Sequence, residues 1–332
     1  MSVNMKGKSF LTLMDLSAQE IRYLLDLAHD LKAKKRMGLC GQALKGKNIV
    51  LLFEKTSTRT RCSFEVAAKE EGGNVTYLDP GSSQMGKKES LEDTAKVLGR
   101  FFDGIEYRGF DQQVVLDLAK YSGVPVFNGL TDLDHPTQIL ADMMTMEEHL
   151  HKPLKECKVA FVGDVRNNMS YAWMFGCCKM GVDFVGYGPQ ELIDGADKSI
   201  LAACQAEGEK TGAHIQLSDN IDDLKGADVL YSDIWASMGE EELIPQRAKL
   251  LAPYRIDDKM VEHTGNPNVI FMHCLPSFHD TRTTIEAEIA EKFGITEMEV
   301  TDEVFESRQS VVFDQAENRM HTIKAVIYAT LC

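Results

Sequence analysis

A predicted strand-to-helix turn carries the run Ser57-Thr58-Arg59-Thr60-Arg61, which concentrates hydroxyl and guanidinium groups. The apolar segment 48–53 precedes this run, and a helical pattern follows it over 60–71. The first backbone N–H groups of a helix have no intrahelical partner and bind anions, and an arginine fork matches the geometry of phosphate. The run therefore predicts a pocket for a small phosphate-bearing molecule. An ordinary helix cap is the alternative, because Ser and Thr are frequent there.

Two further polar groups occur at ends of predicted elements in the first half of the chain. The tetrapeptide His135-Pro136-Thr137-Gln138 starts a predicted helix, with proline at a tolerated first-turn position. His135 and Gln138 can donate to a carbonyl or phosphate oxygen, although a turn histidine without a chemical role fits equally well. Arg108 ends a strand-like segment and is either a second cation of the pocket or a surface arginine.

The second half of the chain also places polar residues after strand-like segments. Asp233 is a candidate partner for a cationic substrate group. Cys274 is a candidate nucleophile or a residue that lines a pocket. Asn167 and Asn168 follow Gly163-Asp164, where the glycine fingerprint of a dinucleotide-binding loop is absent. Either asparagine can contact a ligand amine or carboxylate, and one of them can instead cap a helix.

The elements that must position these residues alternate between strands and helices. This alternation is typical of βαβ units and predicts an α/β fold with two domains, each a parallel sheet flanked by helices. Ligands of such sheets bind beyond the carboxyl ends of the strands, where the loops described above converge. Strands are predicted at 48–53, 74–78, 104–107, 124–127, 159–162, 182–186, 228–231 and 269–272. Helices are predicted at 16–34, 60–71, 90–101, 112–121, 136–150, 169–180 and 317–331.

A length of 332 residues is typical of two domains. We expect residues 1–150 to form the first domain and residues 151–316 to form the second. We expect residues 317–332 to form a C-terminal helix that packs back on the first domain.

Composition excludes several classes of partner. The formal net charge of −15 argues against binding to nucleic acid or to an anionic membrane surface. No apolar stretch is long enough to predict a transmembrane helix, and the first eight residues lack the apolar segment of a secretory signal. The eight cysteines include no Cys-x-x-Cys pair. Reduced thiols in the cytoplasm are therefore expected, and no metal site is indicated.

Five runs, taken together and in this order, resemble the aspartate/ornithine transcarbamoylase family and span most of the chain. The run at 57–61 marks transcarbamoylases in general, whereas the loops at 237–239 and 273–276 mark the ornithine branch. The five runs are Ser57-Thr58-Arg59-Thr60-Arg61, His135-Pro136-Thr137-Gln138, Asp233-x-Trp235-x-Ser237-Met238-Gly239, His273-Cys274-Leu275-Pro276, and Asp314 to Arg319 followed by His321-Thr322-x-Lys324-Ala325.

This resemblance implies a carbamoyl-phosphate-binding domain followed by an ornithine-binding domain. The implied reaction transfers the carbamoyl group of carbamoyl phosphate to the δ-amine of L-ornithine and gives L-citrulline and phosphate. It belongs to arginine biosynthesis or to the arginine deiminase pathway. No metal or organic cofactor is implied, because carbamoyl phosphate is already activated. The resemblance also implies a homotrimer, or an assembly of trimers, with active sites at subunit interfaces.

The resemblance further implies roles for individual residues. Catalytic roles are implied for Arg59, Arg108, His135, Asp233 and Cys274. Carbamoyl-phosphate contacts are implied for Ser57, Thr58, Arg59, Thr60, Gln84, Arg108, His135, Pro136, Thr137, Gln138, Cys274, Leu275 and Arg319, with Gln84 reaching into a neighbouring subunit's site. Ornithine contacts are implied for Asn168, Asp233, Ser237 and Met238, with Asn167 as the alternative to Asn168. Arg61 is expected to hold the motif in place.

Three alternatives remain open at this point. The first is carbamoyl transfer to aspartate, putrescine or an acylated ornithine, although Asp233 suits a cationic substrate group. The second is a noncatalytic sensor of phosphometabolites or amino acids, and the third is a nicotinamide dehydrogenase. The dehydrogenase is disfavoured because the glycine fingerprint is absent.

Overall fold

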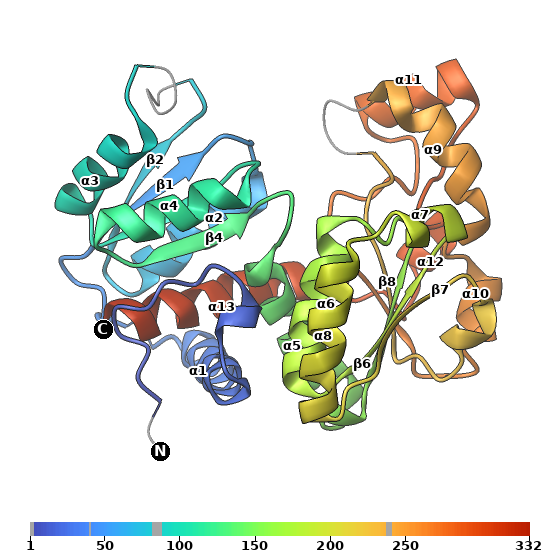
Figure 1. The fold of residues 1–332 in the computed structure, drawn as a ribbon, viewed down its shortest axis with the longest axis horizontal. Helices are drawn as coiled ribbons and strands as arrows, with labels where there is room; N and C mark the ends of the chain where they lie inside the picture. The colour runs from blue at the N-terminus through green and yellow to red at the C-terminus, as the bar shows by residue number, and fades with distance from the viewer. Residues whose placement is uncertain (1–2, 40, 82–87, 237–240) are drawn as a thin grey trace. The chain divides into compact units, whose positions relative to one another are not determined.

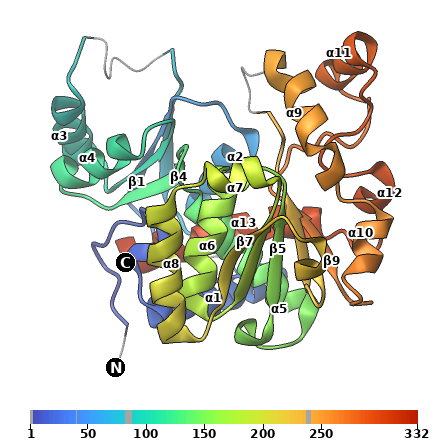
Figure 2. The ribbon, with the colours of Figure 1, turned by 45° about the vertical axis from the view of Figure 1, so that its right-hand side comes forward.

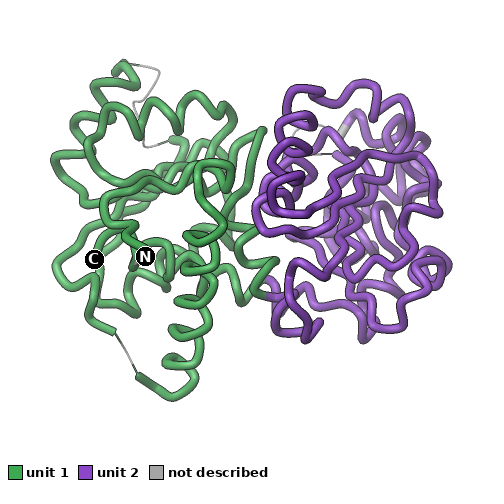
Figure 3. Tube along the Cα trace, turned by 60° about the horizontal axis from the view of Figure 1, so that its bottom comes forward, with its two compact units in different colours: residues 1–144, 316–332 green, residues 145–315 purple. Residues whose placement is uncertain are grey.

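The computed structural model describes residues 3–39, 41–81, 88–236 and 241–332. They form two compact units (Figure 3). Unit 1 comprises residues 1–144 and 316–332, and unit 2 comprises residues 145–315. The chain crosses between the units within two continuous helices, α5 (Pro136–Leu150) and α13 (Val312–Leu331).

Unit 1 is built on a parallel sheet of the strands β1 (Asn48–Phe53), β2 (Asn74–Leu78), β3 (Gly104–Arg108) and β4 (Val126–Leu130). The strand order is β2-β1-β3-β4 (Figure 1). The helices of this unit, besides the parts of α5 and α13, are η1 (Leu13–Asp15), α1 (Ala18–Arg36), α2 (Thr58–Glu70), α3 (Leu91–Phe101) and α4 (Gln112–Ser122).

Alternating side chains of these strands cover the two faces of the sheet. Val50 of β1 and Ile105 of β3 pack with Leu98 of α3 and Leu118 of α4 on one face. Glu106, the next residue of β3, points to the opposite face.

Unit 2 is built on a second parallel sheet, of the strands β5 (Lys158–Val162), β6 (Asp183–Tyr187), β7 (Ile215–Ser218), β8 (Val229–Ser232) and β9 (Ile270–His273). The strand order is β7-β6-β5-β8-β9. Its helices, besides the parts of α5 and α13, are η2 (Leu154–Glu156), α6 (Asn168–Met180), α7 (Gln190–Asp194), α8 (Lys198–Thr211), η3 (Ile221–Leu224), η4 (Glu241–Leu243), α9 (Ile244–Leu251), η5 (Ala252–Tyr254), α10 (Asp258–His263), α11 (Thr284–Phe293) and α12 (Asp302–Phe305).

Helices also cover both faces of this second sheet (Figure 2). Trp173 of α6 meets Tyr231 of β8 edge to face, with ring centroids 5.4 Å apart, on one face. Phe271 of β9 packs with Met260 of α10 and Val304 of α12 on the other. Each unit is therefore a parallel sheet flanked by helices, which confirms the predicted fold class.

Most predicted strands lie within two residues of their observed bounds. The helices α7 to α12 of unit 2 were not predicted, and two further elements differ. The edge strand β7 (Ile215–Ser218) was not predicted, because only four residues alternate and most of them are partly exposed. Helix α13 begins at Val312 rather than at Glu317. Val312 is buried in the core of unit 2, so packing extends the helix beyond the polar run that suggested its start.

None of the described helices is both long enough and apolar enough to cross a bilayer.

Close packing of α3 on α4 makes a stability prediction. A Cβ atom at Gly99 would lie 1.8 Å from the carbonyl oxygen of Ser122. Gly99→Ala should lower the free energy of unfolding by about 1–3 kcal/mol, since overpacking outweighs the better helix propensity of alanine. Urea unfolding followed by circular dichroism measures the change. Lys96→Ala, at an exposed position of the same helix, is the control, and equal stabilities of the two variants would contradict this account.

Candidate active site

The predicted phosphate-binding run lies at the carboxyl edge of the sheet of unit 1. Ser57 caps α2 shortly after β1 ends, and its Oγ accepts a hydrogen bond from the backbone N–H of Thr60 at 3.3 Å. Arg108 is the last residue of β3 and is in register with Phe53, the last residue of β1. His135 directly precedes α5. The parallel topology thus gathers these loops at one edge of the sheet, as the sequence predicted.

Thr60 is the point at which two guanidinium groups meet. Its hydroxyl oxygen accepts hydrogen bonds from Arg108 Nη1 at 3.3 Å and from Arg319 Nη2 at 2.7 Å. Thr60 is fully buried, and Arg319 is 3% exposed. Two cations held together in a buried region favour an anionic ligand, because such a ligand offsets their mutual repulsion.

His135 is a neutral donor beside this cluster. Burial, followed by the charges of Arg319, Arg108 and Arg59, holds the pKa of the imidazole well below its usual value of 6.5. The hydroxyl of Thr137 lies 3.3 Å from His135 Nδ1. If Nδ1 accepts from this hydroxyl, Nε2 carries the proton and can donate to a substrate oxygen.

The two arginines of the first run have different surroundings. Arg61 pairs with Glu65 at 2.8 Å, and its guanidinium lies 3.8 Å from the ring centroid of Tyr77. Arg59 is partly buried and acts electrostatically on His135. Arg61 is thus held by its neighbours, in agreement with a structural role, whereas Arg59 belongs to the cationic cluster.

Other residues of the first two runs lie around this cluster. Pro136 is the first residue of α5. Gln138 is buried, and its amide donates to Asp142 Oδ1 at 2.7 Å, which fixes the orientation of the side chain. Thr58 is exposed at the first turn of α2.

In unit 2, the two asparagines separate into different roles. Asn167 caps α6, and its side chain accepts from the backbone N–H of Met169 at 2.7 Å. Asn168 is the first residue of α6 and is partly buried. The cap thus occupies the oxygen of Asn167, which favours Asn168 as a ligand contact.

Asp233 and Cys274 lie next to each other after the neighbouring strands β8 and β9. The Cys274 thiol donates to Asp233 Oδ1 at 3.1 Å, and the same oxygen accepts from the backbone N–H of Ile234 at 2.8 Å. Leu275, which follows, has φ of 60°. A branched residue in this left-handed region is strained and persists only where its surroundings enforce it.

A buried pair of side chains holds this loop. His273 Nε2 lies 3.3 Å from Glu299 Oε1, and His273 Nδ1 accepts from the backbone N–H of Leu275 at 2.9 Å. Glu299 Oε1 also accepts from the backbone N–H of Phe278 at 2.7 Å and from the hydroxyl of Ser277 at 3.0 Å. Although burial opposes it, the hydrogen bonds from His273 and from the backbone N–H of Phe278 hold the pKa of Glu299 below its usual value.

The side chains of Asp233, His273 and Cys274 have potential metal-ligand atoms within 4.8 Å of one another. Both ring nitrogens of His273 already interact with Leu275 and Glu299. Metal binding would therefore require His273 to leave the contacts that hold the loop.

Three predicted site residues, Gln84, Ser237 and Met238, lie outside the described residues. The others fall into two groups, one in each unit. Unit 1 contains Ser57, Thr58, Arg59, Thr60, Arg108, His135, Pro136, Thr137, Gln138 and Arg319, and unit 2 contains Asn168, Asp233, Cys274 and Leu275.

Two acidic residues near these groups were missed at the sequence level. Glu106 lies two residues before Arg108, and Glu299 supports the loop after His273; both are fully buried. The available signal was the same in each case, a carboxylate flanked on both sides by residues typical of a buried strand.

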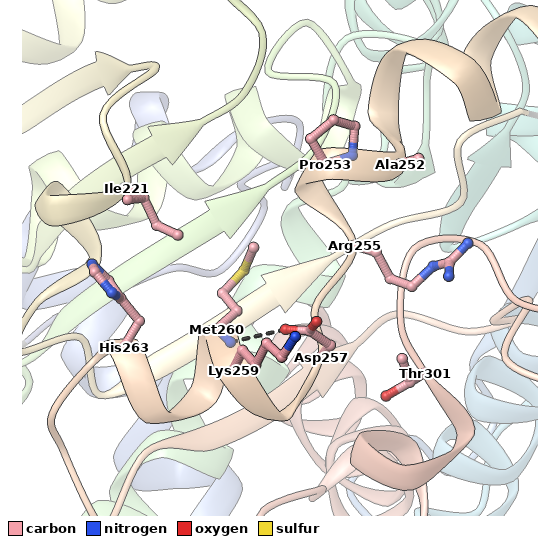
Figure 4. A pocket seen from close by; sticks show the side chains of 9 residues that line it. All are labelled: Ile221, Ala252, Pro253, Arg255, Asp257, Lys259, Met260, His263 and Thr301. Atoms are coloured by element: carbon pink, nitrogen blue, oxygen red, sulfur yellow. Dashed lines mark hydrogen bonds between the residues drawn. The ribbon is translucent and has the colours of Figure 1, made fainter.

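A pocket of about 430 Å³ occurs elsewhere in unit 2 (Figure 4). Figure 4 labels its lining residues as Ile221, Ala252, Pro253, Arg255, Asp257, Lys259, Met260, His263 and Thr301. None of the predicted site residues lines it. Arg255 donates to the carbonyl oxygens of Met298 and Glu297, so its polar atoms are engaged in holding the chain.

Comparison with known proteins connects the two groups of residues to one family. Residues 8–148 match the family description "Aspartate/ornithine carbamoyltransferase, carbamoyl-P binding domain". Residues 155–330 match "Aspartate/ornithine carbamoyltransferase, Asp/Orn binding domain". The chain belongs to the aspartate/ornithine carbamoyltransferase family. The prediction made from the five runs is confirmed, and the protein is a carbamoyltransferase.

Similar members of the aspartate/ornithine carbamoyltransferase family match over almost their full length. A catabolic ornithine carbamoyltransferase of Clostridium perfringens is 63% identical over 332 residues, 99% of each chain. One from Staphylococcus epidermidis, also catabolic, is 57% identical over 330 residues, again 99% of each chain. The solved ornithine carbamoyltransferase of Pyrococcus furiosus has a TM-score of 0.89 and 38% identity, with 99% of each chain covered.

The buried pair His273–Glu299 gives a prediction for stability and its pH dependence. Glu299→Gln removes one partner of a buried pair and should lower the free energy of unfolding by about 3 kcal/mol at pH 7. Because the pKa of Glu299 in the folded state is lower than its usual value of 4.5, the ionised carboxylate stabilises the folded state at pH values above 4.5. This contribution is lost as the pH falls through the folded-state pKa. The difference in the free energy of unfolding between wild type and variant should therefore become smaller below pH 4.5.

Chemical unfolding at several pH values measures this difference. Glu92→Gln, which breaks an exposed pair with Lys96, is the control and should change stability little. A constant difference down to the lowest pH at which the protein folds would contradict the assignment.

Proposed function

We propose that the chain transfers the carbamoyl group of carbamoyl phosphate to the δ-amine of L-ornithine and releases L-citrulline and phosphate. The observation that carries this proposal is the buried cationic cluster of unit 1, in which Arg108 and Arg319 share the hydroxyl of Thr60. A phosphate ester with a polar carbonyl group suits this cluster and the neutral donor His135.

The predicted ornithine carbamoyltransferase activity is confirmed by relatives that are 56–63% identical over nearly the whole chain. Several of these relatives are named catabolic enzymes. Of the two pathways left open by the sequence, we therefore favour arginine catabolism.

The roles of individual residues belong to this proposal. Arg59, Arg108, His135, Asp233 and Cys274 are assigned catalytic roles. Contacts with carbamoyl phosphate are assigned to Ser57, Thr58, Arg59, Thr60, Gln84, Arg108, His135, Pro136, Thr137, Gln138, Cys274, Leu275 and Arg319. Contacts with ornithine are assigned to Asn168, Asp233, Ser237 and Met238.

The reaction requires stabilisation of negative charge. The neutral δ-amine attacks the carbonyl carbon, the new C–N bond forms, and an oxyanion develops on the carbonyl oxygen. The C–O bond to phosphate then breaks, and the amine proton passes to the departing phosphate. We assign to Arg59, Arg108 and His135 the stabilisation of the charge that grows on both oxygens, which is usually the largest catalytic contribution.

The carboxylate of Asp233 suits an amine-bearing acceptor. It lies at the end of β8 and is held by the backbone N–H of Ile234 and the thiol of Cys274. We assign to Asp233 and Cys274 the orientation of the amine. Covalent catalysis by Cys274 is not needed, because the amine attacks the carbonyl directly.

Assembly, location and domain roles extend the proposal. Membership of the family supports a homotrimer, or an assembly of trimers, in which Gln84 reaches a neighbouring subunit. Cysteine usage supports a cytoplasmic location. We assign carbamoyl phosphate to unit 1 and ornithine to unit 2, in keeping with the two family descriptions.

The two arginines of the first run provide a matched test of catalysis. Arg59→Ala should lower kcat by about 10²–10³-fold, because it removes a cation from the developing charge. Arg61→Ala removes the same side chain from a position held by Glu65 and Tyr77 and should leave the turnover number within a few-fold. Citrulline formation at saturating substrates measures both. Equal losses in the two variants would refute the assignment.

The acceptor is tested with ornithine, putrescine and aspartate, each supplied with carbamoyl phosphate. Ornithine should give the highest kcat/KM. Asp233→Asn should reduce kcat/KM for ornithine by about 10²-fold or more, since it removes a charge that pairs with the cationic acceptor. The KM for carbamoyl phosphate should change far less. Preferred carbamoylation of aspartate would overturn the proposed acceptor.

A further inference from the structure

Glu106 is a buried carboxyl group that the proposed mechanism does not use. It lies in β3, two residues before Arg108, and its side chain is 0% exposed. Residues two apart in a strand point to the same face, so Glu106 projects to the face on which Arg108 lies. A charged residue at such a position is rare unless it is paired or has a function.

The sheet makes room for this carboxyl group. The pairing of β3 with β4 shifts register between Tyr107 and Arg108, where the partner changes from Asn128 to Leu130 and leaves out Gly129. A Cβ atom at Gly129 would lie 1.9 Å from Glu106 Oε1. Only a residue without a side chain fits there, so the bulge and the glycine together accommodate the carboxyl group.

Glu106 has apolar neighbours in the sheet, and two cations act on it. Its neighbours in register are Leu51 on β1 and Phe127 on β4. The charged groups that act on it are Arg108, from β3 itself, and Arg319, from α13. Within the described part of the chain, neither carboxyl oxygen of Glu106 has a hydrogen-bond partner.

These opposing influences make the carboxyl group sensitive to its neighbours. Burial raises the pKa of Glu106 well above its usual value of 4.5, and the charges of Arg108 and Arg319 oppose this rise. Both arginines also donate to Thr60, at the proposed binding site for phosphate. Any anion that engages them reduces their effect on Glu106.

We propose that binding of the phosphate group at Arg108 and Arg319 is coupled to the uptake of a proton by the carboxyl group of Glu106. At a pH above its pKa in the free protein, Glu106 thus offsets the charge of the arginines before the anion binds, and it becomes neutral when a dianion binds. This inference rests on the proposed binding of carbamoyl phosphate to unit 1.

Charge balance gives the reason for this coupling. A phosphate dianion at Arg108 and Arg319 would bring two further negative charges close to an ionised Glu106 in a buried region, where repulsion is strong. A proton on Glu106 removes the charge of this carboxyl group. Because proton uptake and anion binding are linked, affinity for phosphate should fall as the pH rises above the pKa of Glu106 in the free protein.

Proton uptake by two neighbouring groups can be distinguished from uptake by Glu106, because it occurs at a different pH. The pKa of His135 lies well below 6.5, so linkage through His135 acts in the acidic range. Burial raises the pKa of Asp134 to about 7, so linkage through Asp134 is centred near neutrality. Above about pH 8.5, phosphate in solution is essentially dianionic, and uptake there is assigned to Glu106.

Isothermal titration calorimetry with inorganic phosphate tests the proposal. Titrations of the full-length protein in buffers of different ionisation enthalpy, from about pH 7 to pH 10, give the number of protons bound per phosphate. A pKa change of only about one unit gives a maximum uptake of about half a proton, so the wild type should reach at least this value at a pH between the pKa of Glu106 in the free protein and its pKa in the complex.

Glu106→Gln keeps the shape of the side chain but cannot take up the proton. It should bind phosphate with uptake near zero above about pH 8.5. Asp134→Asn changes another fully buried acid of unit 1 and should retain the wild-type uptake, which makes it the matched control. The wild-type titration is decisive by itself if Glu106→Gln fails to fold.

Different failures have different meanings. Phosphate binding without proton uptake in the wild type, or with undiminished uptake in Glu106→Gln, overturns the role of Glu106 and leaves the proposed function intact. Absence of phosphate binding, together with absence of citrulline formation by the same preparation, overturns both the proposed function and this inference.

Discussion

Two guanidinium groups that share one buried hydroxyl acceptor set the main electrostatic constraint on unit 1. Arg108 and Arg319 come from a strand and from the last helix, and Thr60 joins them from the first turn of α2. Burial, together with these charges, keeps His135 neutral, and the charges oppose the neutralisation of Glu106. A cluster of this kind is well suited to a strongly anionic substrate, because the cost of gathering the cations is met during folding and the ligand then relieves it.

The loop of unit 2 depends on a different interaction. The buried pair of His273 and Glu299 holds the backbone at Leu275, where φ is in the left-handed region. This pair also keeps both nitrogens of His273 engaged, so Cys274 and Asp233 form their own contact beside it. A strained loop held by a buried pair is more rigid than a loop held by surface contacts, which suits the orientation of an attacking amine.

The sequence predicted the parts of the fold and of the site that depend on local pattern. The alternation of apolar strands with helices indicated the parallel sheets, and strand ends indicated which loops meet. Packing over long sequence distances decided the rest: Val312 extends α13 because it is buried in unit 2, and β7 is a short edge strand. Glu106 could not be assigned from its neighbours in sequence, because its surroundings come from β4 and α13.

The division of unit 1 into residues 1–144 and 316–332 has a consequence for biosynthesis. Thr60 and Arg319 are separated by 259 residues, so the donor that completes the cationic cluster is translated long after its acceptor. At about 5–20 residues per second, the ribosome needs on the order of 10–50 s to cover this interval. For most of that time the nascent chain contains the four strands of its first sheet without the final helix, and a chain that ends before residue 319 lacks this donor.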